Sequence, residues 1–297
     1  MRYTNKTGLP SGIFEALVKD TYDGVKDDPN SISVSALMNP PLQRQLYIKH
    51  NAEIVEDASD RLWSVFGSAV HAVLNNISGD GRLKECRFSQ DVQGMKVNGQ
   101  PDLFDIGSGV LEDYKVTSVW SLVFGQKDKD GKVEWERQLN CYAWLLRKAG
   151  YVVNKMQIIA ILRDWNKSNA QKDEDYPRSP IQIIQIKDWG FADQERYVME
   201  RVSAHKSAQE VPIEQVPICG DEERWFRPGK FAVQQEGKSK AERLLDTKEE
   251  AEKFVKGMTE KAQKSVTIVE RKGIDTKCAN YCSVARFCSY GKQYFNN

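Results

Sequence analysis

Three short β-like runs separated by glycine turns constrain the fold of this chain more than any other feature. Residues 84–92, 95–105 and 110–116 have the composition of strands, and their short, turn-like separations predict one antiparallel meander. A helical pattern follows over 134–149, and a buried-looking strand over 155–163. Strands joined by hairpins and followed by a helix and a further strand predict an α/β fold with a mixed central sheet flanked by helices.

Composition divides the chain into three parts. With 297 residues, 40% of them hydrophobic, the chain can bury a large core and is not a disordered or collagen-like protein. We expect residues 1–66 to form a helical cover and residues 67–210 to form the sheet-containing core. Proline and glycine mark a boundary near residue 211, so residues 211–297 are expected to be an appendage without a second full core.

Hydropathy and charge narrow the class of protein. No apolar run approaches the roughly 18–20 residues of a membrane span, and the amino terminus lacks the apolar core of a signal peptide. We therefore expect a cytoplasmic protein with no membrane partner. The 43 basic and 42 acidic residues give a formal charge of +1, far less basic than a non-specific nucleic-acid coat protein. A nucleic-acid enzyme remains open, because acidic metal ligands can offset a local basic groove.

Two aspartates and a lysine are the candidate catalytic residues. Alternation along a strand places Asp113 and Lys115 on one face, and a hairpin turn at 106–109 brings the strand that holds Asp102 beside them. Carboxylates bind Mg²⁺ or Mn²⁺, the metal polarises a phosphate, and a lysine orients or activates water. The residues together suit metal-assisted phosphodiester hydrolysis, although an Asp-x-Lys pair alone is common on solvated strands.

One histidine and one helical pair add to this set. His71 follows Gly67 by one helical turn, just before the first β-like run, where a neutral imidazole could be a further metal ligand. The other two histidines are expected to be structural or on the surface. Gln138 and Tyr142 present an amide and a phenol on one helical face. By periodicity alone, this pair better fits the polar edge of an amphipathic helix.

The order of these motifs resembles that of a known superfamily. Gly67-x3-His71, Pro101-Asp102, Asp113-Tyr114-Lys115 and Gln138-x3-Tyr142 are similar to the motifs of the PD-(D/E)XK nucleases, specifically the RecB-like branch found in phages and bacteria. The resemblance implies a restriction-endonuclease-like sheet and a Mg²⁺- or Mn²⁺-dependent deoxyribonuclease. It assigns metal binding to His71, Asp102, Asp113 and the Tyr114 carbonyl, a catalytic role to Asp102, Asp113 and Lys115, and the positioning of DNA to Gln138 and Tyr142.

Three cysteines crowd into the tail of the chain. Cys278, Cys282 and Cys288 lie within eleven residues, and without a secretion signal such a cluster indicates metal ligands rather than disulfides. Several members of the superfamily that this chain resembles end in a similar cluster that helps to bind iron and sulfur. The resemblance therefore implies a [4Fe–4S] cluster, although four thiolates would equally suit a structural Zn²⁺ by ligand count.

The fourth cysteine is the point where the chain departs from the family pattern. Related nucleases supply it from upstream of the Gly-x3-His motif, but residues 1–66 contain no cysteine. We choose Cys219, because it lies in a proline- and glycine-bounded loop that opens the same appendage. Cys86 and Cys141 lie singly in strand-like and helix-like stretches, where ordinary packing is expected.

These features predict an exonuclease that acts on DNA ends or single strands in recombination, repair or phage replication, in a bacterial or phage-infected cell. The alternatives are a structure-specific endonuclease of the same superfamily, an inactive DNA-binding module with a structural metal, and a zinc-ribbon interaction protein. No P-loop is present, so a helicase or recombination partner would be another chain. Candidate DNA contacts are Lys127, Lys129, Lys132, Lys230, Lys238, Lys240 and Arg243, with base stacking on Trp120 and Trp135.

Overall fold

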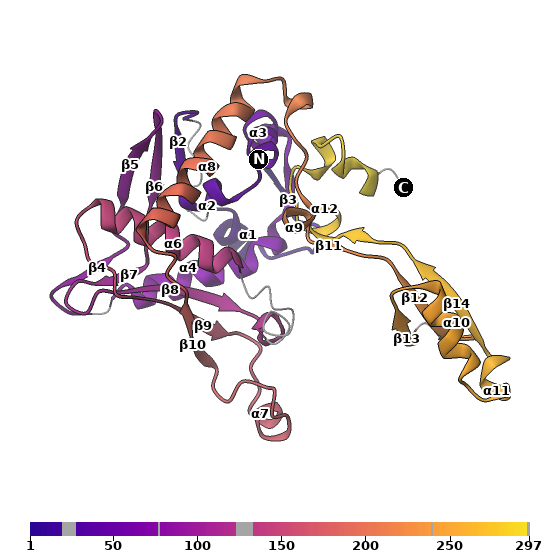
Figure 1. Ribbon diagram of the computed structural model, residues 1–297. Coiled ribbons are helices and arrows are strands. Elements are labelled where there is room, and N and C mark those ends of the chain that lie inside the picture. Colours follow the sequence, from indigo (N-terminus) through magenta and orange to yellow (C-terminus); the bar gives the residue numbers. More distant parts are fainter. Residues whose placement is uncertain (20–27, 77, 123–132, 239, 296–297) are drawn as a thin grey trace. The chain divides into compact units, whose positions relative to one another are not determined.

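The computed structural model describes residues 1–19, 28–76, 78–122, 133–238 and 240–295 (Figure 1). The chain divides into two compact units, Met1–Val216 and Pro217–Asn297. Neither unit contains, within these residues, a helix long and apolar enough to cross a membrane.

A five-stranded mixed sheet is the centre of the first unit. Its central pair is parallel and is connected by helix α6, and the remaining neighbours pair antiparallel. This mixed sheet with flanking helices confirms the predicted α/β class. In spatial order the strands are β10 (Ile181–Ile186), β9 (Lys155–Leu162), β8 (Val110–Thr117), β7 (Leu103–Asp105) and β4 (Arg82–Lys84), and α6 spans Val133–Lys148.

Helix α6 covers one face of this sheet. Leu139 and Leu146 on the helix are fully buried, as are Leu111, Met156 and Ile158 on the strands beneath it. The alternation of buried and less buried residues along β8 and β9 follows from the two-residue period of a strand, which turns one side chain in two toward α6. Each such large apolar side chain contributes about 1.5–3 kcal/mol when fully buried.

The β-like runs 84–92, 95–105 and 110–116 do not form one meander, so that prediction is wrong. β5 (Phe88–Val92) and β6 (Met95–Gly99) join β2 (Ser31–Ser33) in a separate three-stranded sheet. Pro101 interrupts the run between β6 and β7, because proline cannot donate a ladder hydrogen bond. Gly99 at the end of β6 lies so close to α6 that an added Cβ would meet a Leu145 methyl at 2.4 Å.

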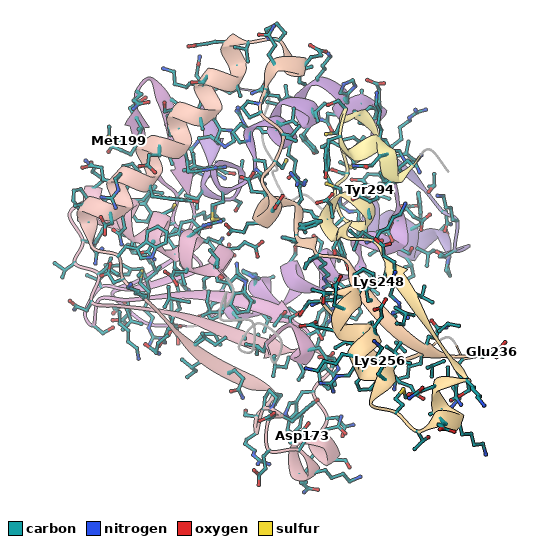
Figure 2. All side chains as sticks on the ribbon, turned by 45° about the vertical axis from the view of Figure 1, so that its right-hand side comes forward. Asp173, Met199, Glu236, Lys248, Lys256 and Tyr294 are labelled. Atoms are coloured by element: carbon teal, nitrogen blue, oxygen red, sulfur yellow. The ribbon has the colours of Figure 1, made fainter. Side chains whose placement is uncertain are left out.

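Helices cover the rest of the first unit. Figure 1 shows helix α8 (Phe191–Glu210) on the side of α6 that faces away from the central sheet, and the two helices are in contact. The stretch 164–180 contains a short helix, α7 (Lys167–Lys172), that ends just before Asp173 (Figure 2). The further elements are β1 (Arg2–Thr4), α1 (Ser11–Val18), α2 (Val34–Met38), α3 (Pro41–His50), η1 (Asn51–Glu53), β3 (Val55–Asp57), η2 (Ala58–Arg61), α4 (Leu62–Leu74), α7 (Lys167–Lys172), α8 (Phe191–Glu210) and η3 (Ile213–Gln215).

The second unit has its own small sheet. Strands β13 (Ala241–Leu245), β12 (Lys230–Gln235) and β14 (Val266–Arg271) are antiparallel, and helix α10 packs on them with Ala251 fully buried. Lys248 and Lys256 mark the two ends of α10 in Figure 2. The remaining elements are α9 (Asp221–Arg224), β11 (Phe226–Arg227), α11 (Glu260–Gln263), β15 (Ile274–Asp275), α12 (Thr276–Asn280), η4 (Ala285–Phe287) and η5 (Gly291–Tyr294).

A buried histidine joins α8 to the end of α2. The imidazole Nε2 of His205 lies 3.1 Å from the carbonyl oxygen of Leu37. Burial lowers the pKa of His205 to about 4; the charges of Arg201 and Arg44 act in the same direction, and hydrogen bonds to the backbone of Leu37 and Asn39 oppose them. The folded protein therefore holds this imidazole neutral.

Acid should weaken this contact. An unfolded histidine titrates near pH 6.5, so the contribution of His205 to stability is complete above about pH 6.5 and is lost as the pH falls toward about 4. His205→Gln keeps a donor for Leu37 but does not titrate. The difference in unfolding free energy between wild type and this variant, measured by urea unfolding, should shrink by roughly 3 kcal/mol between about pH 7 and pH 4. A difference that does not depend on pH would contradict this assignment.

Candidate active site

The β7–β8 hairpin brings the two predicted aspartates together. Leu103 pairs with Glu112, so the next residues outward, Asp102 and Asp113, lie across from each other. Asp102 precedes β7, and its Oδ2 accepts a hydrogen bond of 2.7 Å from the backbone N–H of Tyr114. The aspartate side chain thus extends the pairing of the two strands beyond the last ladder residue, which fixes the position of its carboxylate.

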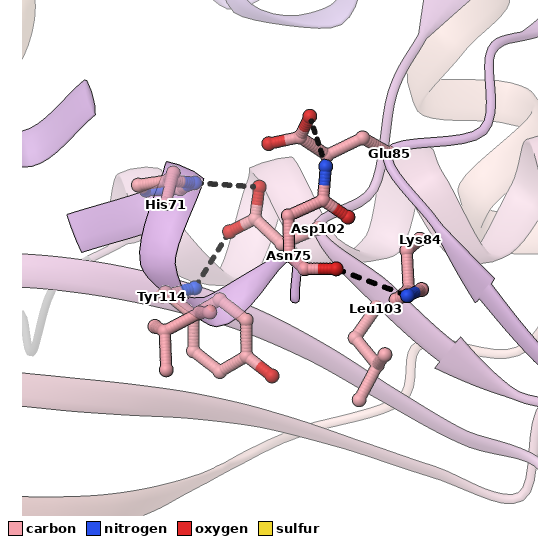
Figure 3. Close-up of a pocket in the computed structure, with 8 residues that line it drawn as sticks. His71, Asn75, Lys84, Glu85, Asp102, Leu103 and Tyr114 are labelled. Atoms are coloured by element: carbon pink, nitrogen blue, oxygen red, sulfur yellow. Dashed lines mark hydrogen bonds and ion pairs between the residues drawn. The ribbon is translucent and has the colours of Figure 1, made fainter. Parts of the chain in front are cut away.

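Helix α4 adds the histidine to this pair (Figure 3). The Nδ1 of His71 lies 3.3 Å from Oδ1 of Asp102. The imidazole also meets the ring of Tyr114 edge to face, with the ring centroids 6.2 Å apart. The hydrogen bond to Asp102 raises the pKa of His71 above its usual value. Asp102 therefore holds the imidazole on one side and the backbone of β8 on the other.

Asp113 is the most buried charged group of the site. Its side chain is 2% exposed, and Lys115 Nζ lies 2.6 Å from its Oδ2. This ion pair holds that oxygen, which accepts no backbone hydrogen bond within the described residues. Burial raises the pKa of Asp113, the nearby charge of Asp102 raises it further, and Lys115 opposes this change. A buried carboxylate with one ion pair and no backbone hydrogen bond is an environment that a hard cation would stabilise further.

The side chains of His71, Asp102 and Asp113 are of the types that bind a divalent cation, but their donor atoms are not yet close enough together to hold one. Two carboxylates and an imidazole are ordinary ligands for Mg²⁺ or Mn²⁺. Within the part of the chain that the structure describes, no three His, Cys, Asp or Glu donors are already spaced to hold a metal ion. Binding of a cation would therefore require His71, Asp102 and Asp113 to draw closer together.

A third carboxylate beside this cluster was missed by the sequence reasoning. Glu85 follows β4 and adopts φ = 45°, in the left-handed region that costs a residue other than glycine about 1–3 kcal/mol. Its N–H pairs with the Asp102 carbonyl, and its Oε2 accepts a hydrogen bond of 3.1 Å from Asn75 at the end of α4. No motif marks this glutamate, because its role follows from a backbone conformation that the sequence does not encode plainly.

The same contacts fix the end of α4 that carries His71. Lys84 Nζ donates to the carbonyl of Asn75, the residue that caps the helix, at 3.0 Å. Beside these residues is a cavity of about 10 Å³, which is room for about one water molecule. It is lined by His71, Leu74, Asn75, Lys84, Glu85, Asp102, Leu103 and Tyr114 (Figure 3).

The predicted helical pair on α6 is joined side chain to side chain. Gln138 Nε2 donates to the Tyr142 hydroxyl at 3.0 Å, and the largely buried Tyr142 ring lies against Gly99 on β6. Of the two tryptophans considered for base stacking, Trp120 is half exposed and Trp135 packs against the core. The proposed contacts Lys127, Lys129 and Lys132 lie outside the described residues.

The predicted cluster cysteines share one neighbourhood of the second unit. All four are free thiols: Cys219 precedes α9, Cys278 lies in α12, and Cys282 and Cys288 follow it. Burial raises the pKa of Cys219 to about 12, and the charges of Glu223 and of the three tail cysteines contribute. Helices α9 and α12 are in contact, which brings the segments with Cys219 and Cys278 together, but no three of the described thiols are already spaced to hold a metal ion. Cys141, by contrast, is fully buried within α6 in the first unit.

Comparison with known proteins gave similarities to solved structures only. No protein-family model matches the chain, and no curated protein matches it. A protein named SSO0001 is 17% identical, with a TM-score of 0.44, over 65% of this chain and 84% of its own. A phage-related exonuclease from Haemophilus somnus is 14% identical, with a TM-score of 0.31, over 66% and 78%. The alkaline exonuclease LHK-Exo from Laribacter hongkongensis is 12% identical, with a TM-score of 0.36, over 61% and 90%.

Proposed function

We propose that this chain is a Mg²⁺- or Mn²⁺-dependent deoxyribonuclease of the PD-(D/E)XK type, in its RecB-like branch. The observation that carries the proposal is the gathering of Asp102, Asp113 and Lys115 at the end of the β7–β8 hairpin, with the carboxylate of Asp113 buried and paired with Lys115. A solvated strand with an accidental Asp-x-Lys pair has no reason to bury its aspartate, because an ionised carboxylate is costly to remove from water.

Each residue has a part in phosphodiester hydrolysis. His71, Asp102 and Asp113 would hold the cation, with the carbonyl of Tyr114 assisting, and the cation would supply Lewis-acid polarisation of the phosphate. The Lys115 ammonium lies beside Asp113, where it would orient water and stabilise charge that develops on the attacked phosphate. Gln138 and Tyr142 would position DNA near the scissile bond.

The proposed substrate is a DNA end or single strand, and the proposed setting is recombination, repair or phage replication in the cytoplasm of a bacterial or phage-infected cell. Both follow from the resemblance of the motifs to RecB-like exonucleases. A helicase or recombination protein on another chain would supply duplex unwinding. A structure-specific endonuclease of the same superfamily is the alternative that the same site would support.

Linear and circular DNA should separate these two activities. With Mg²⁺ or Mn²⁺ the protein should consume end-labelled linear DNA and spare closed circular single-stranded and duplex DNA, and EDTA should stop cleavage. Asp113→Asn and Lys115→Ala should each lower the rate at least about 100-fold, because each removes charge at the reacting phosphate. Glu112→Gln is the matched control, since Glu112 lies on the opposite face of β8 and binds Gln157.

Two results would count against this function. Full activity in Asp113→Asn would remove the hairpin from the chemistry. Rapid cutting of both circles would replace the exonuclease with the endonuclease alternative. Retained cleavage in Glu112→Gln would show that loss of a carboxylate from β8 is not by itself damaging.

We further propose that Cys219, Cys278, Cys282 and Cys288 hold a [4Fe–4S] cluster, with a structural Zn²⁺ as the alternative. Four free cysteines on neighbouring segments of one small unit support this, because thiolates are the ligands both groups require, and binding would draw the thiols closer together. The burial and charge that raise the pKa of Cys219 would be offset by a bound metal, which stabilises the thiolate.

Protein purified without oxygen should be brown and should contain iron and sulfide. Ser substitution at each of the four cysteines should remove the colour and lower the thermal stability of the second unit, because metal binding contributes to its folding. Cys86→Ser and Cys141→Ser are the controls and should keep the colour. Stoichiometric zinc without iron would replace the iron–sulfur assignment by a zinc site with the same four ligands. Colour that survives Cys219→Ser would exclude Cys219 as a ligand.

A further inference from the structure

Helix α4 carries an exposed apolar surface that its packing does not explain. None of its thirteen residues is buried, although they read LWSVFGSAVHAVL. Trp63 is 52% exposed and Phe66 is 43% exposed, and their rings meet edge to face with centroids 6.3 Å apart. Large aromatic side chains that are exposed to solvent, on the helix that carries His71, indicate a ligand-binding surface.

A cation completes this surface. The guanidinium of Arg163, which directly follows β9, lies over the ring of Trp63 at 4.2 Å. An arginine stacked on an aromatic face keeps its N–H donors along its edge, where they can bind phosphate. Because β8 and β9 are parallel, their carboxyl ends lie at the same edge of the sheet. Arg163 therefore lies beside the end of β8, the strand that carries Asp113 and Lys115.

Gly67 connects the aromatic residue to the histidine. Trp63, Gly67 and His71 follow one another at i, i+4 and i+8, which is one row along a helix. Gly67 has ordinary helical backbone, and outside the helix's own backbone a Cβ built there would meet no atom of the described residues within 4 Å. Neither backbone conformation nor packing against the described part of the chain requires this glycine, which costs about 1 kcal/mol of helix stability relative to alanine.

A single nucleic-acid strand fits these three observations. The distance from Trp63 to His71 along the helix axis is about 12 Å, the length of roughly three to four stacked nucleotides. Aromatic faces stack on unpaired bases of any sequence, and a missing Cβ lets a ligand approach the helix backbone. Duplex DNA offers no unpaired base faces along its sides for such stacking.

We propose that the row Trp63–Gly67–His71, with Arg163 over Trp63, is the track that receives the single-stranded end of DNA. Trp63 stacks a base, Arg163 binds a phosphate, and Gly67 leaves room for the strand to lie against α4 on its way to the carboxylates. The proposal rests on the nuclease function above and names the residues that bind its single-stranded substrate.

Binding without cleavage tests the track directly. In EDTA, a fluorescein-labelled oligothymidylate should bind the wild-type protein more tightly than a blunt duplex of equal length, as measured by anisotropy. Trp63→Leu should weaken single-strand binding by about 5- to 150-fold, the range for loss of one base–aromatic stack. Trp63→Phe should retain most of the affinity, because it keeps an aromatic face. Val73→Ala, at a 70% exposed position on another face of α4, should have no effect.

Gly67→Ala separates a binding role of this glycine from a structural one, because the two roles predict opposite changes in melting temperature. It should raise the melting temperature, because alanine favours a helix and meets no atom there, yet weaken single-strand binding at least about fivefold. Ser68→Ala, the next residue of the helix, should leave binding unchanged. A lower melting temperature in Gly67→Ala would assign the glycine to the fold and overturn its place in the track.

The outcomes separate this proposal from the nuclease function. If the wild type digests linear DNA and the Trp63 and Gly67 variants bind and digest as it does, the track is wrong and the nuclease stands. If the wild type binds oligothymidylate but digests no DNA, and the Trp63→Leu and Gly67→Ala variants lose this binding, the track stands and the nuclease function is wrong. No binding of the oligothymidylate by the wild type, or equal loss in Trp63→Phe and Trp63→Leu, would overturn the track.

Discussion

A buried carboxylate on the central sheet is the constraint around which the site is built. Asp113 faces the same side of β8 as the apolar residues beneath α6, where an ionised group is costly. Lys115, two residues along the same face, supplies a positive charge that the alternation of the strand places 2.6 Å from Asp113. Asp102 opposes that arrangement, because its charge raises the pKa of Asp113. Two aspartates and one lysine leave a deficit of positive charge, which a bound cation would offset.

The surrounding elements keep that deficit in place. Asp102 cannot turn away, since it accepts the N–H of Tyr114 and lies beside His71. His71 in turn is fixed by the end of α4, which Lys84 and Glu85 bind through Asn75. A strained Glu85 backbone and two adjacent carboxylates are unfavourable for folding, and such costs are typical of functional sites. The exposed Trp63 lies on the same helix as His71, so a strand that binds Trp63 would be directed along α4 toward the histidine.

The sequence predicted those parts of the structure that follow from local periodicity. Helix α6, strand β9 and the hairpin with Asp102 and Asp113 follow from spacing and turn residues, and they account for the class of the fold. The split of the meander could not be read in this way, because β-strand pairing depends on distant partners such as β2. Glu85 and Arg163 were missed for a similar reason, since a left-handed backbone and a cation over Trp63 arise only in three dimensions. The sheet of the second unit was not predicted, because its short strands and small apolar core leave little periodic signal in the sequence.

Binding of Mn²⁺ tests the central claim most directly, and electron paramagnetic resonance can measure it without DNA. The account predicts one tight Mn²⁺ site in the wild type, which Asp113→Asn and Asp102→Asn weaken at least about tenfold through loss of a charged ligand. Lys115→Met should bind Mn²⁺ more tightly than the wild type, because the ammonium 2.6 Å from Asp113 no longer competes for its oxygen, while cleavage is lost. Equal Mn²⁺ affinity in all four proteins would contradict a metal site at the end of the β7–β8 hairpin.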